Sequence, residues 1–320
     1  MPKFKIITLG CRVNQAESAA IADRLVEAHW EPADPNEAAD LCLINTCTVT
    51  RRAAMQSRQA IRRAIQENSA AHVAATGCYA ATDPPALLKI KGLDGLIAQK
   101  DKLNLPEILA PAAQPFSPLF PKEGGELFKS PPIEYAGSPK HAPALPLTAA
   151  RTRPLLKIQD GCDAFCTYCI VPYARGPSRS LPLPAVLDAV SRLSARGFLE
   201  VVLTGIHLGN YGKDLSPRAS LTELLQALLE RPDPIQIRLS SIEPLELTDT
   251  LIELAAQDER ICRHFHVPLQ SGDAQILERM GRPYSPEDYG GRIARIRSRL
   301  PEAVQDTRHG ISHSFSATTP

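Results

Sequence analysis

Short apolar runs alternate with longer amphipathic stretches over the first hundred residues of the chain. The apolar runs are 4–9, 41–44, 72–76 and 96–97, and the amphipathic stretches are 15–29, 52–67 and 84–91. Short apolar runs that end in glycine or polar residues are typical of strands. Apolar residues that recur every three to four positions are typical of helices. The alternation therefore predicts a parallel α/β sheet with its ligands at the carboxyl ends of the strands.

The second half of the chain repeats this alternation with four further units. Strands are predicted at 155–159, 200–204, 235–239 and 264–267, and helices at 181–195, 221–229, 248–257 and 286–300. Thr248 stands where a helix N-cap is expected, because its side chain can accept from a free backbone N–H. Four β/α units in series predict part of a (β/α) barrel, with its site on the C-terminal ends of the strands.

Proline separates these two halves. Many of the 29 proline residues fall between 106 and 154, where they prevent both helix and interior strand. We therefore predict an N-terminal domain over 1–109, a Pro-rich linker over 110–150 and a second domain over 151–304. A polar Ser/Thr-rich tail then follows over 305–320.

Charge and hydropathy restrict the possible partners. The 320 residues carry 36 Lys and Arg against 35 Asp and Glu, so the whole chain is not a strongly basic nucleic-acid binder. A local basic stripe is nevertheless expected on the helix at 52–67 and beside it, and Arg175 and Arg179 form a second basic pair. No apolar run approaches the roughly 18 residues of a membrane span. A soluble cytoplasmic protein without a membrane partner is expected.

The richest chemical signal is the run Cys162-Asp-Ala-Phe-Cys166-Thr-Tyr-Cys169, which follows a predicted strand. Three closely spaced thiolates suit a [4Fe-4S] cluster that keeps one iron open, because such a cluster has four ligand positions. An open iron can bind a small molecule. A structural zinc site is the alternative, although zinc sites usually close with four ligands and no well-spaced fourth Cys or His lies nearby.

Three further cysteines each follow a different predicted strand of the first domain. They are Cys11, Cys47 and Cys78. The carboxyl ends of parallel strands meet at one edge of the sheet, so the three thiols can come together as a second three-thiol group. Three separate core or loop cysteines are the alternative, because buried Cys is common in its own right. Cys42 lies inside a predicted strand and is expected to pack as a small apolar side chain.

The Cys162–Cys169 run, with Tyr168 just before its third cysteine, resembles the radical S-adenosylmethionine (SAM) superfamily. The resemblance implies that Cys162, Cys166 and Cys169 hold a cluster whose open iron chelates SAM, with Tyr168 near the adenine. One electron from the cluster would cleave SAM to a 5′-deoxyadenosyl radical. The strand-end blocks around His207, Ser241 and Gln270 also resemble that superfamily, which implies a SAM site that includes Thr204, Gly205, Ser241, Glu243 and Gln270.

The first domain resembles that of the methylthiotransferases. The resemblance rests on Thr8-Leu-Gly-Cys-Arg-Val-Asn-Gln-Ala-Glu-Ser18, Asn45-Thr-Cys-Thr-Val49 and Thr76-Gly-Cys-Tyr79. It implies a Rossmann-like N-terminal methylthiotransferase domain followed by a radical SAM partial TIM barrel. It further implies two [4Fe-4S] clusters plus SAM, with the auxiliary cluster on Cys11, Cys47 and Cys78.

The form Leu-Gly-Cys-Arg-Val-Asn-Gln, with Val13, most resembles the threonylcarbamoyladenosine tRNA subgroup. The implied reaction adds a methylthio group to C2 of N6-threonylcarbamoyladenosine beside the tRNA anticodon. The implied partners are the tRNA anticodon loop and a reductant such as flavodoxin or ferredoxin; the sequence does not identify the sulfur donor.

The resemblance stops near residue 300. The tail over 305–320 lacks a core pattern, so the sequence favours a C-terminally truncated chain with an incomplete barrel. Two alternatives to the tRNA reaction therefore stay open: the same chemistry on a ribosomal protein, and a non-catalytic truncated iron-sulfur protein.

Overall fold

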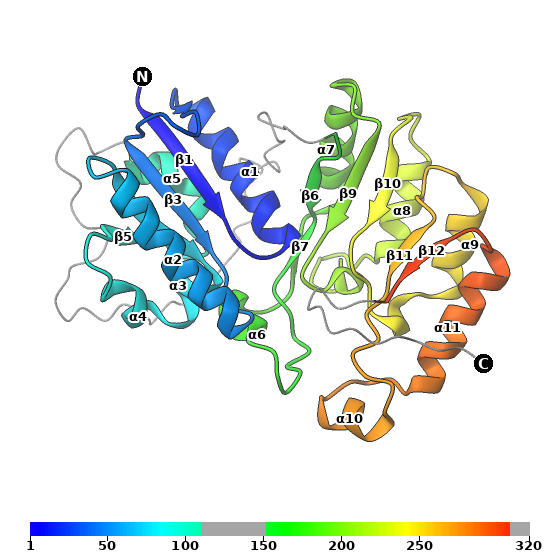
Figure 1. Cartoon of the computed structure of the whole chain (residues 1–320). Helices are drawn as coiled ribbons and strands as arrows, with labels where there is room; N and C mark the ends of the chain where they lie inside the picture. The colour runs from blue at the N-terminus through cyan, green and yellow to red at the C-terminus, as the bar shows by residue number, and fades with distance from the viewer. Residues whose placement is uncertain (110–151, 308–320) are drawn as a thin grey trace.

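The computed structural model describes residues 1–109 and 152–307. The predicted linker at 110–150 lies outside the described residues, as does most of the predicted tail. The two described parts lie side by side, the first in blue to cyan and the second in green to red (Figure 1).

The first part is a five-stranded parallel sheet with helices on both faces. In spatial order its strands are β2 (Glu31–Pro32), β1 (Lys3–Thr8), β3 (Leu41–Thr46), β4 (His72–Gly77) and β5 (Gly95–Leu96). The helical segments are α1 (Arg12–Glu27), α2 (Arg51–Glu67), α3 (Cys78–Thr82), α4 (Pro84–Leu88), η1 (Lys102–Asn104) and α5 (Leu105–Leu109). The order 2-1-3-4-5 reverses direction between β1 and β3, and such a switch point is where open α/β sheets bind ligands.

Strand β3 shows why this sheet is buried on both faces. Leu41 and Leu43 join one apolar core with α1 and α5, whereas Cys42 and Ile44 join a second core with α2. Alternate residues of a strand point to opposite faces, so an unbroken apolar run serves both cores. Cys42 packs in its strand as expected, with no exposed surface.

The second part is a curved set of parallel strands with helices on its outer side (Figure 1). Strands β6 (Leu155–Lys157), β9 (Glu200–Thr204) and β10 (Gln236–Leu239) form one sheet, and β11 (His264–His266) pairs with β12 (Val304–Asp306). Isolated bridges from Ile237 to Ile261 and from Ser241 to His266 continue the parallel arrangement from β10 to β11. The predicted α/β fold class, with parallel β/α units in both described parts, is thus confirmed.

The remaining elements of the second part cover the barrel strands or shape its rim. The helices are α6 (Val171–Arg175), α7 (Leu183–Ala195), α8 (Leu221–Leu229), α9 (Asp249–Gln257), α10 (Ala274–Arg279) and α11 (Pro286–Arg299). The shorter elements are β7 (Gln159–Asp160), β8 (Arg179–Ser180), η2 (Leu208–Asn210) and η3 (Pro244–Glu246). Thr248 caps α9 as expected by accepting from the Leu251 N–H at 3.2 Å.

Strand β12 differs from the sequence prediction, which assigned residues 305 and 306 to a tail without core pattern. Its three residues are only partly buried, and they pair with β11 through the backbone. A strand held by backbone hydrogen bonds needs no apolar alternation, so periodicity did not reveal it. Residues 308–320 lie outside the described part of the chain.

Candidate functional site

The cysteines of the first part lie at the carboxyl ends of three adjacent strands. Cys11 is the N-cap of α1 after β1, Cys47 follows β3, and Cys78 begins α3 directly after β4. Cys11 is exposed, whereas Cys47 and Cys78 are buried. The sheet therefore brings three thiols separated by many residues to one edge, at and beside its switch point.

Local contacts hold the backbone of this edge in place. Ser57 on α2 donates from Oγ to the Cys47 carbonyl at 2.8 Å and accepts from the Cys47 N–H at 3.1 Å. Gly10 has a φ of +92°, and a Cβ placed there would lie 2.8 Å from the Cys47 Sγ. Glycine is thus required at position 10 both by its backbone conformation and by the closeness of the thiol.

The electrostatic surroundings of these thiols are mixed. Burial raises the pKa of Cys78, and the nearby Arg175 opposes that rise. Burial likewise raises the pKa of Cys47, and Cys11 adds to the rise while Arg175 counters it. A metal ion or iron-sulfur cluster bound by these thiols would favour their thiolate forms.

The second group of cysteines lies on the loop between β7 and α6. The Cys169 N–H donates to the Cys166 carbonyl at 2.9 Å, and the Cys162 N–H donates to the Gly176 carbonyl at 3.1 Å. The loop is also tied to the end of α10, since the Thr167 N–H donates to the Met280 carbonyl at 3.2 Å. Cys166 is buried, and the other two thiols are partly exposed.

His207 links this loop to the barrel rim. Its Nδ1 lies 3.5 Å from the Cys162 Sγ, and its Nε2 lies 2.5 Å from a carboxylate oxygen of Glu246. Burial lowers the pKa of His207, but the bonds to Cys162 and Glu246 outweigh that effect and raise it to about 10. The imidazole is therefore held in one orientation between a carboxylate and a thiol.

A polar network joins the Cys162–Cys169 loop to the ends of the barrel strands. The Tyr168 hydroxyl donates to the Gln270 Oε1 at 2.9 Å and accepts from the Arg282 Nη2 at 2.6 Å. Arg282 also pairs with Glu243 through Nη1, at 2.8 Å from the Glu243 Oε1. The Arg282 guanidinium further lies 5.8 Å from the centre of the Tyr168 ring, within cation–π range.

Two atoms of this network are buried without a hydrogen-bond partner among the described residues. They are the Glu243 Oε2 and the Arg282 Nε. Unsatisfied buried charged groups are costly, and at a strand-end rim they indicate room for a polar ligand. The amino and carboxylate groups of SAM have the charges that such a pair would bind, so the residues present fit this cofactor.

The other predicted SAM residues lie along the same rim. Thr204 ends β9 with a buried side chain, and Gly205 follows it, where a Cβ would lie 2.8 Å from the Gln159 Oε1. The Ser241 hydroxyl is 2.6 Å from the His266 Nδ1. Tyr168, Glu243 and Gln270 thus form one bonded network through Arg282, and Thr204 and Ser241 lie at the ends of the neighbouring strands β9 and β10.

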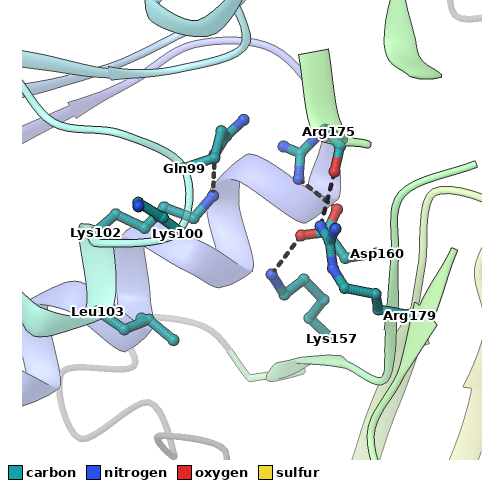
Figure 2. Close-up of a pocket in the computed structure, with 8 residues that line it drawn as sticks. All are labelled: Gln99, Lys100, Lys102, Leu103, Lys157, Asp160, Arg175 and Arg179. Carbon is teal, nitrogen blue, oxygen red and sulfur yellow. Dashed lines mark hydrogen bonds and ion pairs between the residues drawn. The ribbon is translucent and has the colours of Figure 1, made fainter. Parts of the chain in front are cut away.

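Buried charges connect the two parts of the molecule. Arg175 at the end of α6 donates to Glu17 at 2.9 Å, to Asp160 at 2.8 Å and to the Asn14 Oδ1 at 2.5 Å. Lys157 also reaches both Glu17 and Asp160, at 2.8 and 3.0 Å. Figure 2 shows Arg175, Asp160 and Lys157 grouped on one side of a small cavity.

This charged cluster relates the two cysteine groups. Asn14 and Glu17 lie on the helix that Cys11 caps, and Arg175 lies six positions after Cys169. The side chain of Arg175 is almost fully buried and lies close enough to influence the pKa of both Cys47 and Cys78. The relative position of the two cysteine groups therefore depends on ion pairs between distant segments.

Several of these residues were not predicted from the sequence. Arg282 and Glu246 lie outside the strand-end blocks that resemble the superfamily. Glu17 lies on a predicted amphipathic helix, where polar residues are common. An apolar pattern around Glu17 could have identified it, because Ala16, Ile21 and Leu25 are buried on the same helix. Arg175 was singled out as a phosphate-binding candidate, yet its guanidinium is taken up by Glu17, Asp160 and Asn14.

In the two described ranges, no group of three or more His, Cys, Asp or Glu side chains is arranged to hold a metal ion. Each thiolate of a four-iron cluster bonds a different iron, so its ligands need not meet at one point. The donor sets, three thiols at each of two loop edges, fit [4Fe-4S] clusters in ligand type. The described residues also contain no helix long and apolar enough to cross a membrane.

Two family models match different parts of the chain. Residues 3–98 match the family described as "Uncharacterized protein family UPF0004". Residues 156–313 match the radical SAM superfamily.

Curated relatives resemble the chain over most of its length. The threonylcarbamoyladenosine tRNA methylthiotransferase MtaB of Bacillus subtilis is 37% identical, over 92% of this chain and 63% of the relative. The protein of the same name from Aquifex aeolicus is 38% identical, over 90% of this chain and 67% of the relative. A tRNA-2-methylthio-N(6)-dimethylallyladenosine synthase of Pelotomaculum thermopropionicum is 32% identical, over 96% and 68%. The chain thus covers about two thirds of the length of the second and third relatives and 63% of the length of the first.

Solved structures share the fold. The radical SAM methyltransferase TsrM of Kitasatospora setae, with cobalamin and a [4Fe-4S] cluster bound, superposes with a TM-score of 0.61. That match covers 93% of this chain and 68% of the other at 16% identity. The cobalamin-dependent radical enzyme OxsB gives a TM-score of 0.58 at 12% identity, over 92% and 48%. At such identities the likeness concerns the arrangement of the two α/β parts.

Proposed function

Because the chain belongs to the family of radical SAM methylthiotransferases, we propose that it adds a methylthio group to C2 of N6-threonylcarbamoyladenosine at position 37 of tRNA. Two relatives with 37% and 38% identity carry the name of that activity. Val13, in the block after Cys11, favours the same substrate over the isopentenyladenosine and ribosomal-protein alternatives.

One observation supports the proposal most directly: Arg175, shortly after the Cys162–Cys169 loop, bonds Glu17 and Asn14 on the helix that Cys11 caps. A transferase that both activates a C–H bond and delivers sulfur needs two reactive centres near one substrate atom. We assign Cys162, Cys166 and Cys169 to the cluster that binds SAM, and Cys11, Cys47 and Cys78 to the auxiliary cluster. When bound, these groups would supply one-electron cleavage of SAM and the sulfur to be transferred.

The residues of this chain would bind and orient the reactants. Glu243 and Arg282 present opposite charges from the rim and would hold the amino and carboxylate groups of SAM. Tyr168, fixed by Gln270 and Arg282, would lie beside the adenine. Thr204, Gly205 and Ser241 would line the remaining rim, where Gly205 allows close approach to Gln159.

We further propose that the anticodon loop of tRNA is bound across the two cysteine edges. Phe165 and Tyr173 are exposed beside the cluster loop and form an edge-to-face pair with centroids 5.8 Å apart. Exposed aromatic rings stack with unpaired bases of RNA loops. Exposed arginines at the start of α2, Arg51 and Arg52, would neutralise phosphates. A reductant such as flavodoxin or ferredoxin would supply the electron in the cytoplasm, where tRNA is modified; the sulfur donor is not assigned.

The direct test is a methylthiolation assay on tRNA. The protein is reconstituted anaerobically with iron and sulfide, then incubated with reductant, SAM and tRNA that carries N6-threonylcarbamoyladenosine, and the nucleosides are analysed by mass spectrometry. We expect the methylthio product from the unchanged chain. No product is expected from a variant with Cys162, Cys166 and Cys169 replaced by Ala, or from one with Cys11, Cys47 and Cys78 replaced by Ala.

Metal analysis separates the competing functions. Two three-thiol clusters predict about eight irons, falling to about four in either triple variant. Iron without SAM cleavage would favour a non-catalytic iron-sulfur protein, and zinc without labile sulfide would favour a zinc module. SAM cleavage with product on a ribosomal protein, and none on tRNA, would replace the proposed substrate.

A further inference from the structure

A fourth strand of the first part brings a polar side chain to the cysteine edge. Strand β5 pairs with β4, and the Ile97 N–H donates to the Ala75 carbonyl at 2.9 Å. The Thr76 Oγ1 donates to the Ile97 carbonyl, also at 2.9 Å. Cys78 follows β4 and Gln99 follows β5, so the parallel pairing brings these two residues to the same edge of the sheet.

The amide of Gln99 is directed at the thiol of Cys78. Its Nε2 donates to the Cys78 Sγ, with 4.0 Å between the two atoms. Cys78 is 3% exposed, so water has little access to this sulfur. One of the three thiols at this edge therefore has a side-chain amide as its hydrogen-bond donor.

Lys102 determines which end of the amide faces the sulfur. Its Nζ donates to the Gln99 Oε1 at 2.5 Å, as Figure 2 shows, and pairs with the Glu17 Oε2 at 2.6 Å. An ammonium group has donors and no acceptor, so it selects the oxygen of the amide and leaves the NH2 group for Cys78. The side chains of Lys102 and Glu17 are 4% and 1% exposed, which protects this arrangement from competing water.

We propose that Gln99 is a positioning residue of the auxiliary site: its amide donates to the Cys78 thiolate and raises the reduction potential of the iron-sulfur cluster bound there. A hydrogen bond to a ligand sulfur favours the reduced cluster, which carries more negative charge, and such bonds are among the factors that set cluster potentials. The inference rests on the assignment of Cys11, Cys47 and Cys78 under the proposed function. It does not depend on which substrate receives the sulfur.

The reduction potential of the auxiliary cluster tests the proposal. The cluster-loaded protein is titrated anaerobically and followed by electron paramagnetic resonance, and the two triple-Ala variants assign the signals to the two clusters. Gln99→Leu keeps a neutral side chain without a donor. We expect its auxiliary cluster to be about fivefold to tenfold harder to reduce, which is a fall of about 40–60 mV for a one-electron couple. The potential of the Cys162–Cys169 cluster should stay unchanged and serves as the internal reference.

A second variant separates the lost donor from a change in packing. Gln99→Glu keeps an oxygen for Lys102 but has no N–H for Cys78, so the auxiliary potential should fall again, while iron stays at about eight per chain. Gln66→Leu and Gln66→Glu make the same two exchanges at an exposed position near the end of α2. Both control variants should titrate as the wild type does.

The hydrogen bond itself has a spectroscopic signature. Electron-nuclear double resonance of the reduced auxiliary cluster, compared in H2O and D2O, detects exchangeable protons that lie close to the cluster. We expect the wild type and the Gln66 variants to show one exchangeable-proton coupling that Gln99→Leu and Gln99→Glu lack. A role of Gln99 in packing alone would leave these couplings unchanged.

The outcomes separate this inference from the proposed function. Wild-type potentials and couplings in both Gln99 variants would overturn the role of Gln99 and leave the auxiliary cluster in place. Loss of the auxiliary iron from both Gln99 variants would make Gln99 a structural residue and would also overturn the inference. A wild-type protein with about four irons, all lost when Cys162, Cys166 and Cys169 are replaced, would instead remove the auxiliary cluster from the proposed function.

Discussion

The Arg175 Nη1 lies 2.9 Å from the Glu17 Oε1, although 158 positions separate the two residues in the chain. Both side chains are 1% exposed. Burial by itself would raise the pKa of Glu17, but Arg175 and the two lysines overcome that effect and hold it well below its usual value. The carboxylate therefore remains ionised inside the interface, and the two cysteine-bearing parts are joined by full charges.

Removing Arg175 should destabilise the protein strongly. Arg175→Met removes the guanidinium that bonds both Glu17 and Asp160, and breaking such buried pairs costs about 3–5 kcal/mol. The free energy of unfolding in urea measures the loss. Arg231→Met is the matched control, because Arg231 pairs with Asp233 at a site where its side chain is 42% exposed and such pairs contribute about 1 kcal/mol or less. Equal losses of unfolding free energy in both variants would show that the buried ion pairs of Arg175 stabilise the protein no more than an exposed pair does.

The contact between Gly10 and Cys47 predicts selective loss of one cluster. Gly10→Ala places a methyl group 2.8 Å from the Cys47 Sγ, so the thiol must move. We expect iron to fall from about eight to about four per chain, with the Cys162–Cys169 site retained. Gly197→Ala is the control, because Gly197 has a similar φ of +83° but no atom within 4 Å of the added Cβ. Full iron content in Gly10→Ala would argue against Cys47 as a ligand.

Because Arg282 joins the rim residues, we expect its replacement to weaken SAM binding. Arg282→Met removes the partner of Glu243 and of Tyr168, and hydrogen bonds to charged groups contribute about 1.5–3 kcal/mol. The dissociation constant for SAM, measured by calorimetry on cluster-loaded protein, should rise about tenfold to a hundredfold. Iron content should stay unchanged, and Arg263→Met, at an exposed position before β11, should bind SAM as the wild type does. Unaltered affinity in Arg282→Met would remove this residue from the SAM site.

The lowered pKa of Lys102 predicts that the stability of the protein depends on pH. Its pKa in the folded protein is about 8, below the 10.5 of an ordinary lysine, and burial is the main cause. Between these pH values the unfolded chain binds a proton that the folded chain has released, so the free energy of unfolding rises with pH. The wild type should gain on the order of 3 kcal/mol over this window relative to Lys102→Met. Glu17, Asp160 and Arg175 face Lys102 and keep their charges throughout it. Parallel profiles for the two proteins would mean that Lys102 titrates normally.

Local patterns predicted the main strands and helices of the two α/β parts. The strand at 200–204 and the helix at 221–229 have the predicted bounds, because apolar periodicity reflects burial on one or two faces. The helix predicted at 15–29 begins earlier, at Arg12, since Cys11 caps it without a side-chain hydrogen bond that the sequence could announce. Strand β12 was missed because its pairing rests on backbone bonds and not on an apolar pattern.

The sequence by itself predicted the two α/β parts and the two groups of three cysteines, and its motif resemblance implied the rim residues Tyr168, Glu243 and Gln270. These follow from periodicity, spacing and motif, which are properties of neighbouring residues. Only the tertiary structure decided that Arg282 joins the rim residues, that His207 lies between Cys162 and Glu246, and that Arg175 pairs with Glu17. Such pairings depend on which charged groups burial brings together across the whole chain, and the energy of a buried charge depends on partners that no local pattern specifies.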